Sequence, residues 1–149
     1  IAKDVMKALE KGRRCLILSH WKEHCQILAD MLSRDGKTPL MLSGGQGKKE
    51  RTALLKAIQD TPMVKDLVVV ATGQYLGEGF DDSRLDTLFL TMPISWKGTL
   101  AQYVGRLHRN HQDKTNVIVY DYVDQAVPML VRMAARRQTG YRALGYAIG

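Results

Sequence analysis

Short apolar runs alternate along the chain with longer segments in which apolar residues recur every three or four positions. The short runs predict strands at residues 15–18, 39–42, 67–71, 85–90 and 116–120. The longer segments predict helices at residues 2–11, 21–34, 48–59, 97–109 and about 125–146. Strands that are apolar throughout are typical of a parallel sheet covered by helices on both faces. The pattern therefore predicts one α/β domain over residues 1–149, with a mainly parallel central sheet and a helical tail at about 125–149.

The predicted topology also indicates where a ligand would bind. Parallel α/β sheets bind ligands beyond the carboxyl ends of their strands. We therefore expect ligand-binding residues in the loops that begin after residues 18, 42, 71 and 90. In the helix at 21–34, we expect the inward residues to be Ile27, Leu28, Met31 and Leu32.

The C-terminal tail combines an apolar stripe with basic residues. The expected stripe is Val127, Leu130, Val131 and Ala134. The basic residues are Arg132, Arg136, Arg137 and Arg142, and no acidic residue occurs from 125 onward. These arginines either face nucleic acid or a neighbouring domain, or form an ordinary solvated surface. The apolar residues Tyr141, Leu144, Tyr146 and Ile148 suggest a contact with other parts of a longer protein.

Composition and charge narrow the class of protein. A chain of 149 residues, 45% apolar, holds one core and is too short for two ordinary domains. Its formal net charge of +7 attracts polyanions such as nucleic acid, although the same charge serves solubility alone. Cys15 and Cys25 lie in apolar segments, which favours a reducing, cytoplasmic location over a disulfide framework. The chain starts at Ile1, has no signal-peptide pattern and no run long enough to cross a membrane, so we interpret it as part of a longer protein without a membrane partner.

Two segments carry candidate chemistry. The glycine-rich segment at 72–81 follows the most apolar strand, so a phosphate can approach its backbone while Thr72 donates a hydroxyl and Asp81 accepts a sugar hydroxyl. The alternative is that these glycines only turn the chain. In the segment at 102–109, Arg106 and Arg109 share one face if the segment is helical, and paired guanidinium groups suit a triphosphate. The alternative is a solvated helix face.

Considered together, these segments resemble motifs V and VI of superfamily-two helicases and translocases. The matching residues are Ala71-Thr72-Gly73 with Gly79-Phe80-Asp81, and Gln102 with Gly105-Arg106 and Arg109. Ser19-His20-Trp21 is similar to motif IV, and Ser43-Gly44-Gly45 with Lys49-Glu50-Arg51 is similar to the strand-turn-helix element that follows it. The resemblance covers residues 13 to about 122. It implies a RecA-like three-layer sandwich, the second lobe of an ATP-dependent nucleic-acid motor.

The resemblance implies roles at the nucleotide for five residues. Arg109 would be the arginine finger on the γ-phosphate of ATP held by the partner lobe, and Arg106 would contact the same phosphates or the partner lobe's acidic motif. Gln102 would line the nucleotide site. The backbone of Gly79 would approach the phosphates, and Asp81 would hold the ribose or order the finger.

The resemblance implies contacts with the nucleic-acid backbone for four other residues. Thr72 and Gly44 are the principal candidates, with Arg51 and Ser19 as weaker ones. DNA is favoured over RNA as the partner. One departure concerns Gly73, because many family members have an acidic residue directly after the motif V threonine.

The chain lacks the residues that hold a nucleotide and its metal. The segment Gly44-Gly45-Gln46-Gly47-Lys48-Lys49 does not have the phosphate-loop spacing, and no strand ends in an acidic pair for Mg²⁺. His20 and His24 have the i, i+4 spacing of a zinc helix, but the order is His-Trp-Lys-Glu-His and not His-Glu-x-x-His, so no metal site is expected here. We therefore expect ATP and Mg²⁺ to be bound mainly by an N-terminal RecA-like lobe and the isolated chain to be inactive. The alternatives are a catalytically inactive helicase-like module that binds nucleic acid or protein, and a dinucleotide-binding enzyme, which would need a glycine-rich turn where Ser19-His20-Trp21 stands.

Overall fold

A five-stranded parallel sheet forms the centre of the molecule. The computed structural model describes residues 1–43, 46–62, 66–72, 84–96, 100–101, 104, 107 and 116–149. The strands are β1 (Cys15–Ser19), β2 (Leu40–Leu42), β3 (Val68–Thr72), β4 (Thr87–Leu90) and β5 (Ile118–Asp121). Their order in the sheet is β2-β3-β1-β4-β5, and each neighbouring pair is parallel. The predicted parallel α/β architecture is therefore confirmed.

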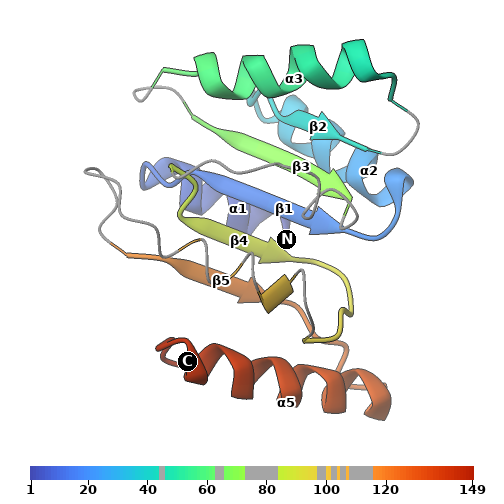
Figure 1. Cartoon of the computed structure of the whole chain (residues 1–149), viewed down its shortest axis with the longest axis vertical. Helices are drawn as coiled ribbons and strands as arrows, with labels where there is room; N and C mark the ends of the chain where they lie inside the picture. Colours follow the sequence, from blue (N-terminus) through green and yellow to red (C-terminus); the bar gives the residue numbers. More distant parts are fainter. Residues whose placement is uncertain are drawn as a thin grey trace.

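Helices cover both faces of this sheet. They are α1 (Ala2–Glu10), α2 (Lys22–Arg34), α3 (Lys48–Asp60) and α5 (Pro128–Ala143). In Figure 1, α3 lies beside β2 at one end of the sheet and α5 lies beside β5 at the other. All strands point the same way, so their carboxyl ends form one edge of the molecule. The five predicted strands and these four predicted helices are confirmed to within about three residues at each end.

One face of the sheet packs on α1 and α2. Its core joins Val5 of α1 and Leu32 of α2 to Ile17 of β1 and Val70 of β3, all of them fully buried. Beside them, the Phe89 ring of β4 stacks on a tyrosine of β5 with centroids 4.6 Å apart. Burying large apolar side chains of this kind stabilises the fold by about 1.5–3 kcal/mol each.

The opposite face packs on α3, α5 and the described residues between β4 and β5. Ile58 of α3 and Tyr141 of α5 belong to this core. So do Leu100, Val104 and Leu107, which are at most 3% exposed. These three residues follow helical spacing within the predicted helix at 97–109, and the structure assigns Leu100 and Val104 to helix.

The inward face of α2 differs from the sequence prediction at two positions. Leu28 and Leu32 are buried as expected, but Ile27 is 57% exposed and Met31 is 42% exposed. Cys25 and Ala29 complete the buried face instead. The contact of α2 is thus centred on smaller side chains, which allow the helix to approach the sheet closely and leave the neighbouring stripe in solvent.

The inward face of α5 was also predicted incorrectly in part. Ala134 is buried and Leu130 is half-buried, as expected, but Val131 is 36% exposed. Arg137 and Tyr141 continue the buried stripe at helical spacing, with exposures of 1% and 4%. The prediction that Arg137 faces a ligand or solvent is therefore wrong. Hydropathy alone assigns a charged residue to the surface, whereas here a neighbouring carboxylate makes its burial possible.

An ion pair anchors α5 to the end of β5. The Arg137 Nε and Nη2 atoms donate to the two carboxylate oxygens of Asp121 at 2.7 and 2.9 Å. The Arg137 Nη1 atom donates to the carbonyl of Ile94 at 2.7 Å, and the Tyr141 hydroxyl donates to Asp121 Oδ2 at 2.9 Å. Burial and the nearby Asp121 carboxylate raise the pKa of Tyr141, so its phenol remains a donor at neutral pH.

A glycine allows α5 to meet the loop after β4. A Cβ atom on Gly140 would lie 2.0 Å from the indole of Trp96, a distance that no packed side chain tolerates. The Trp96 ring also packs edge-on against Tyr141, with centroids 5.1 Å apart, and Tyr141 packs against Tyr146. Tyr141 and Tyr146 therefore contact residues of this chain, whereas Leu144 and Ile148 are 38% and 40% exposed.

The buried thiols predict a loss of stability at alkaline pH. Cys15 is inaccessible to solvent, and burial, with the nearby Asp86 carboxylate, raises its pKa from 9.0 to about 12. Because the folded state holds this proton more tightly than the unfolded state, the stabilisation is complete below about pH 9 and declines between pH 9 and 12. We expect the free energy of unfolding to fall by about 1.4 kcal/mol from pH 8 to pH 10 on account of Cys15 alone.

Urea unfolding at the two pH values measures this change. In Cys15→Ala, the absolute stability falls because a cavity forms, but the pH-dependent part due to Cys15 disappears. A wild-type chain with the same free energy of unfolding at pH 8 and pH 10 would contradict the prediction. Below pH 9, both cysteines should react with a thiol reagent only after unfolding, since Cys25 is also inaccessible and burial raises its pKa.

Candidate functional site

Two of the predicted nucleic-acid contacts lie side by side at the carboxyl edge of the sheet. Ser19 ends β1, Thr72 ends β3, and the two are paired in the register of these strands. Thr72 is 5% exposed, and its Oγ1 atom has no hydrogen-bond partner among the described residues. A buried hydroxyl without a partner costs about 1–3 kcal/mol, so an acceptor reaching this edge from outside would be bound favourably.

The Ser19 side chain organises the turn that follows β1. It is fully buried, and its Oγ atom lies 2.7 Å from Nδ1 of His24. The same oxygen accepts a hydrogen bond of 3.4 Å from the backbone N–H of Trp21. Its hydroxyl is thus engaged within the chain and fixes how α2 leaves the sheet.

Arg51 lies in the first turn of α3, close after the end of β2. The side chain is half-buried, and its backbone N–H donates to the carbonyl of Gly47 at 3.0 Å. Gln46 holds the preceding turn, since its Nε2 atom donates to the carbonyl of Met41 at 3.0 Å. The start of α3 is therefore fixed relative to the carboxyl end of β2.

The other predicted site residues lie outside the described residues. They are Gly44, Gly79, Asp81, Gln102, Arg106 and Arg109. Their described neighbours are nevertheless well anchored. Val104 and Leu107, on either side of Arg106 in sequence, are 0% and 3% exposed, and the Tyr146 hydroxyl donates to the Val104 carbonyl at 3.3 Å.

Two hollows in the described surface lie at opposite edges of the sheet. A hollow of about 480 Å³ lies at the amino ends of β2 and β3, lined by Lys37, Leu40 and Val68 among others. A second, of about 360 Å³, lies beyond β4 and β5 and is lined by Thr91, Tyr122 and Arg137 among others. Parallel sheets bind ligands at the carboxyl ends of their strands. The hollow of about 480 Å³ lies at the opposite edge, so it is not the candidate site.

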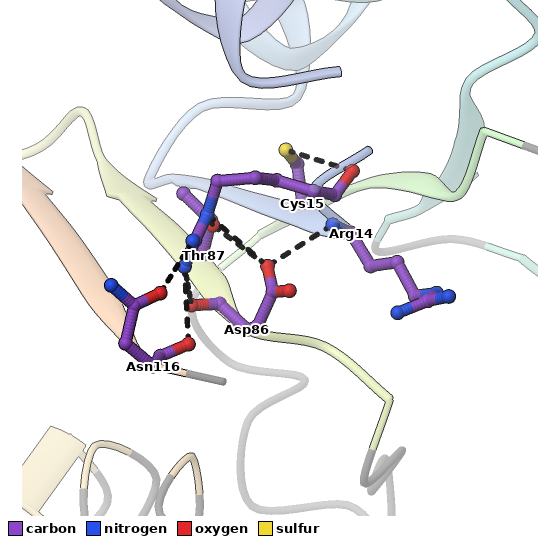
Figure 2. Close-up of polar contacts among 6 residues, drawn as sticks. Arg14, Cys15, Asp86, Thr87 and Asn116 are labelled. Carbon is purple, nitrogen blue, oxygen red and sulfur yellow. Dashed lines mark hydrogen bonds and ion pairs between the residues drawn. The ribbon is translucent and has the colours of Figure 1, made fainter. Parts of the chain in front are cut away.

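The amino edge holds a polar network that serves the fold. Figure 2 shows Asp86, Thr87 and Asn116 gathered beside the start of β1. The Arg13 guanidinium donates to Asn116 Oδ1 at 2.6 Å, while Asp86 Oδ1 accepts from the backbone N–H of Arg14 at 3.1 Å and from the Thr87 hydroxyl at 2.8 Å. The network ties β1, β4 and the chain before β5 together at the edge remote from Thr72.

Sequence reasoning missed the cluster formed by Asp121, Arg137 and Tyr141. A signal was present, because Asp121 directly follows an apolar strand and the other two residues extend the helical spacing of Leu130 and Ala134. The prediction treated Asp121 as part of a loop, so the arginine had no visible partner. Among the described residues, no group of three or more His, Cys, Asp or Glu side chains could hold a metal ion. No helix in the same part of the chain is long and apolar enough to cross a membrane.

The parallel sheet with helices on both faces is a RecA-like fold. Comparison with known proteins gives the family of the chain. The sequence pattern of the helicase conserved C-terminal domain matches residues 2–111. The chain therefore belongs to this family. The match includes both segments singled out in the sequence, and it ends before β5 and α5.

Two curated proteins illustrate the similarity to known sequences. The ATP-dependent DNA helicase UvsW of Enterobacteria phage T4 is 23% identical over 126 residues, and the transcript termination protein A18 of Fowlpox virus is 23% identical over 117. These alignments cover 85% and 78% of the chain but 24% of each relative, so the chain spans about a quarter of their length.

The structural similarities have low sequence identity and concern the fold. The structure of T4 UvsW matches with a TM-score of 0.73 at 20% identity, covering 96% of this chain and 31% of that one. The C-terminal part of the Fun30 ATPase domain matches at 0.72 and 20%, covering 90% and 43%. The Sulfolobus solfataricus SWI2/SNF2 ATPase core in complex with dsDNA matches at 0.58 and 21%, covering 80% and 24%.

Proposed function

We propose that this chain is the second motor lobe of an ATP-dependent helicase or translocase that acts on nucleic acid, with DNA favoured over RNA. The observation that carries the proposal is the family match over residues 2–111, which spans β1 to β4 and both candidate segments. The UvsW relative is an ATP-dependent DNA helicase, and one structural neighbour is an ATPase core in complex with dsDNA. These are properties of those proteins, and they support the same class of activity here.

In this proposal the nucleotide is shared between two lobes. The N-terminal RecA-like lobe of the full-length protein binds ATP and Mg²⁺, and this chain contributes Arg109 as the arginine finger, with Arg106 beside it. Planar guanidinium groups bind phosphate oxygens in a bidentate manner and stabilise the charge that develops during phosphoryl transfer. Gln102, Gly79 and Asp81 line this chain's side of the nucleotide site.

The nucleic-acid backbone is held at the carboxyl edge. Thr72 contacts it there with a hydroxyl that has no partner among the described residues, and Gly44, which follows β2 in the sequence, offers backbone donors to the same strand. Arg51 adds a positive charge at the start of α3, while Ser19 acts by fixing the neighbouring turn, because its hydroxyl is already bonded to His24. Such contacts grip a strand without reading its sequence, as a motor requires. Cycles of ATP binding and hydrolysis close and open the two lobes and so move the grip along the strand.

An ATPase assay of the full-length protein tests the proposal. We expect hydrolysis that single- or double-stranded nucleic acid stimulates, and no hydrolysis by the 149-residue chain alone. The isolated chain should bind oligonucleotides, with an affinity that falls about 20- to 40-fold between 50 and 200 mM salt for three phosphate contacts. A full-length protein that binds nucleic acid without hydrolysing ATP would instead be an inactive binding module. Binding by the isolated chain that is insensitive to salt would contradict the phosphate contacts.

A further inference from the structure

We propose that Trp21 is a stacking platform for an unpaired nucleic-acid base, which adds base contacts to the backbone grip proposed above and rests on that function. Trp21 lies two residues beyond Ser19, at the carboxyl edge that Ser19 shares with Thr72. Its side chain is 61% exposed, the largest such fraction for a large apolar residue among those that the structure describes. The turn between β1 and α2 that carries it follows the β1 arrowhead in Figure 1.

The backbone of Trp21 is fixed although its ring is exposed. Its N–H donates to the buried Ser19 hydroxyl at 3.4 Å, and its carbonyl accepts from the N–H of Cys25 at 3.1 Å. Ser19 is in turn bonded to His24, and Cys25 is fully buried. The turn therefore fixes the point on the edge from which the indole projects. A fixed backbone lowers the conformational entropy that is lost when a base stacks on the ring.

The choice of residue at this position has a cost for the helix. Trp21 is the N-cap of α2, and it makes no side-chain capping hydrogen bond. Serine, threonine, aspartate or asparagine would stabilise the helix by about 1 kcal/mol at an N-cap. An exposed tryptophan thus gives up a cap and buries little area within this chain. A partner at the carboxyl edge accounts for both facts.

The surroundings of Trp21 favour nucleic acid as that partner. The imidazole of His20 meets the indole edge-on, with centroids 6.1 Å apart, and so extends the aromatic surface. Lys22 follows Trp21 in the sequence and is exposed, so it can contact a phosphate, although Glu23 comes next. Aromatic rings beside cationic side chains are how proteins bind single strands without sequence preference, since every base has a face that stacks. Paired bases in a duplex are already stacked, so the proposed ligand is an unpaired base.

Tryptophan fluorescence of the 149-residue chain tests this proposal directly. The chain contains two tryptophans, and the other, Trp96, packs against Tyr141 and Gly140. Both faces of the sheet are covered within the chain, and circular dichroism checks that each variant is folded. We expect a single-stranded oligodeoxynucleotide to quench the fluorescence in wild type and Trp96→Phe, and not in Trp21→Phe. An abasic strand of the same length, which keeps the phosphates, should bind more weakly and quench little.

Affinity measured by fluorescence anisotropy of a labelled strand gives a second readout. Trp21→Ala should weaken binding of the single strand by about tenfold, Trp21→Phe should retain most of the affinity, and the abasic strand should bind both variants equally. The matched control is Ile27→Ala, which removes another exposed apolar side chain of α2 and should change nothing.

The outcomes separate this inference from the proposed function. If wild type binds the strand but Trp21→Ala has the same affinity, or if the abasic strand quenches equally, base stacking is disproved and the backbone grip stands. If wild type binds no oligonucleotide even at 50 mM salt, both proposals are disproved. If Trp21→Ala leaves oligonucleotide binding unchanged but separates the two lobes of the full-length protein, Trp21 is a protein contact.

Discussion

Replacing Arg109 with alanine is expected to lower the ATP turnover of the full-length protein by at least about 10³-fold. The physical reason is that the guanidinium is proposed to meet the charge that develops on the transferred phosphoryl group, where no water can substitute for it. Steady-state hydrolysis with saturating nucleic acid measures the change. Because the interaction strengthens mainly in the transition state, kcat should fall while KM for ATP changes little.

Two further variants make the Arg109 experiment specific. Arg109→Lys keeps the positive charge but loses the planar pair of donors, so it should remain strongly impaired. Arg136→Ala removes an exposed arginine of α5 and should leave turnover unchanged. Oligonucleotide binding and thermal unfolding should also be unchanged in Arg109→Ala. Turnover within threefold of wild type in Arg109→Ala would disprove the finger assignment, and it would leave the family membership intact.

Replacing Arg137 with alanine is expected to destabilise the fold by about 3–5 kcal/mol. Arg137 is 1% exposed and Asp121 is 15% exposed, so the substitution leaves a largely buried carboxylate with Tyr141 as its remaining side-chain donor. The carbonyl of Ile94 also loses its donor. Chemical unfolding of the 149-residue chain measures the change.

Matched variants separate the lost ion pair from lost packing. Arg136→Ala removes the neighbouring exposed arginine and should change stability by no more than about 0.5 kcal/mol. In Arg137→Met with Asp121→Asn, both charges are gone and the apolar volume is retained, so much of the stability should return. A destabilisation below 1 kcal/mol for Arg137→Ala would show that the pair contributes little to the fold.

Much of the fold could be predicted because its strands are apolar throughout. A short run that is apolar throughout, such as the one at β3, predicts a strand covered on both faces. The alternation of such runs with helical segments predicts a parallel sheet. The errors occurred where tertiary contacts outweigh hydropathy. Met31 is apolar but lies on a solvent-facing stripe of α2, whereas Arg137 is charged but lies on the buried stripe of α5.

In the candidate site, only the features that depend on the local sequence could be predicted. The position of Thr72 at the end of β3 follows from its place after an apolar run. Its hydroxyl has no partner in the described part of the chain, which agrees with the proposed ligand contact. The engagement of Ser19 by His24 was not predictable, because the bond depends on how α2 leaves the sheet. The exposure of Trp21 was not predictable for the same reason, because it depends on how the turn joins β1 to α2. The roles of Arg106 and Arg109 stay predictions, since both residues lie outside those that the structure describes.

The family match ends at residue 111, yet the sheet gains its fifth strand, β5, after that point. A chain cut at the family boundary would leave β4 as an edge strand, with a row of unpaired backbone groups and with the Phe89 ring deprived of the tyrosine that stacks on it. Such an edge invites pairing with another molecule and hence aggregation. In this chain β5 pairs along that edge, and the buried Arg137 of α5 is bonded to Asp121 at the end of β5.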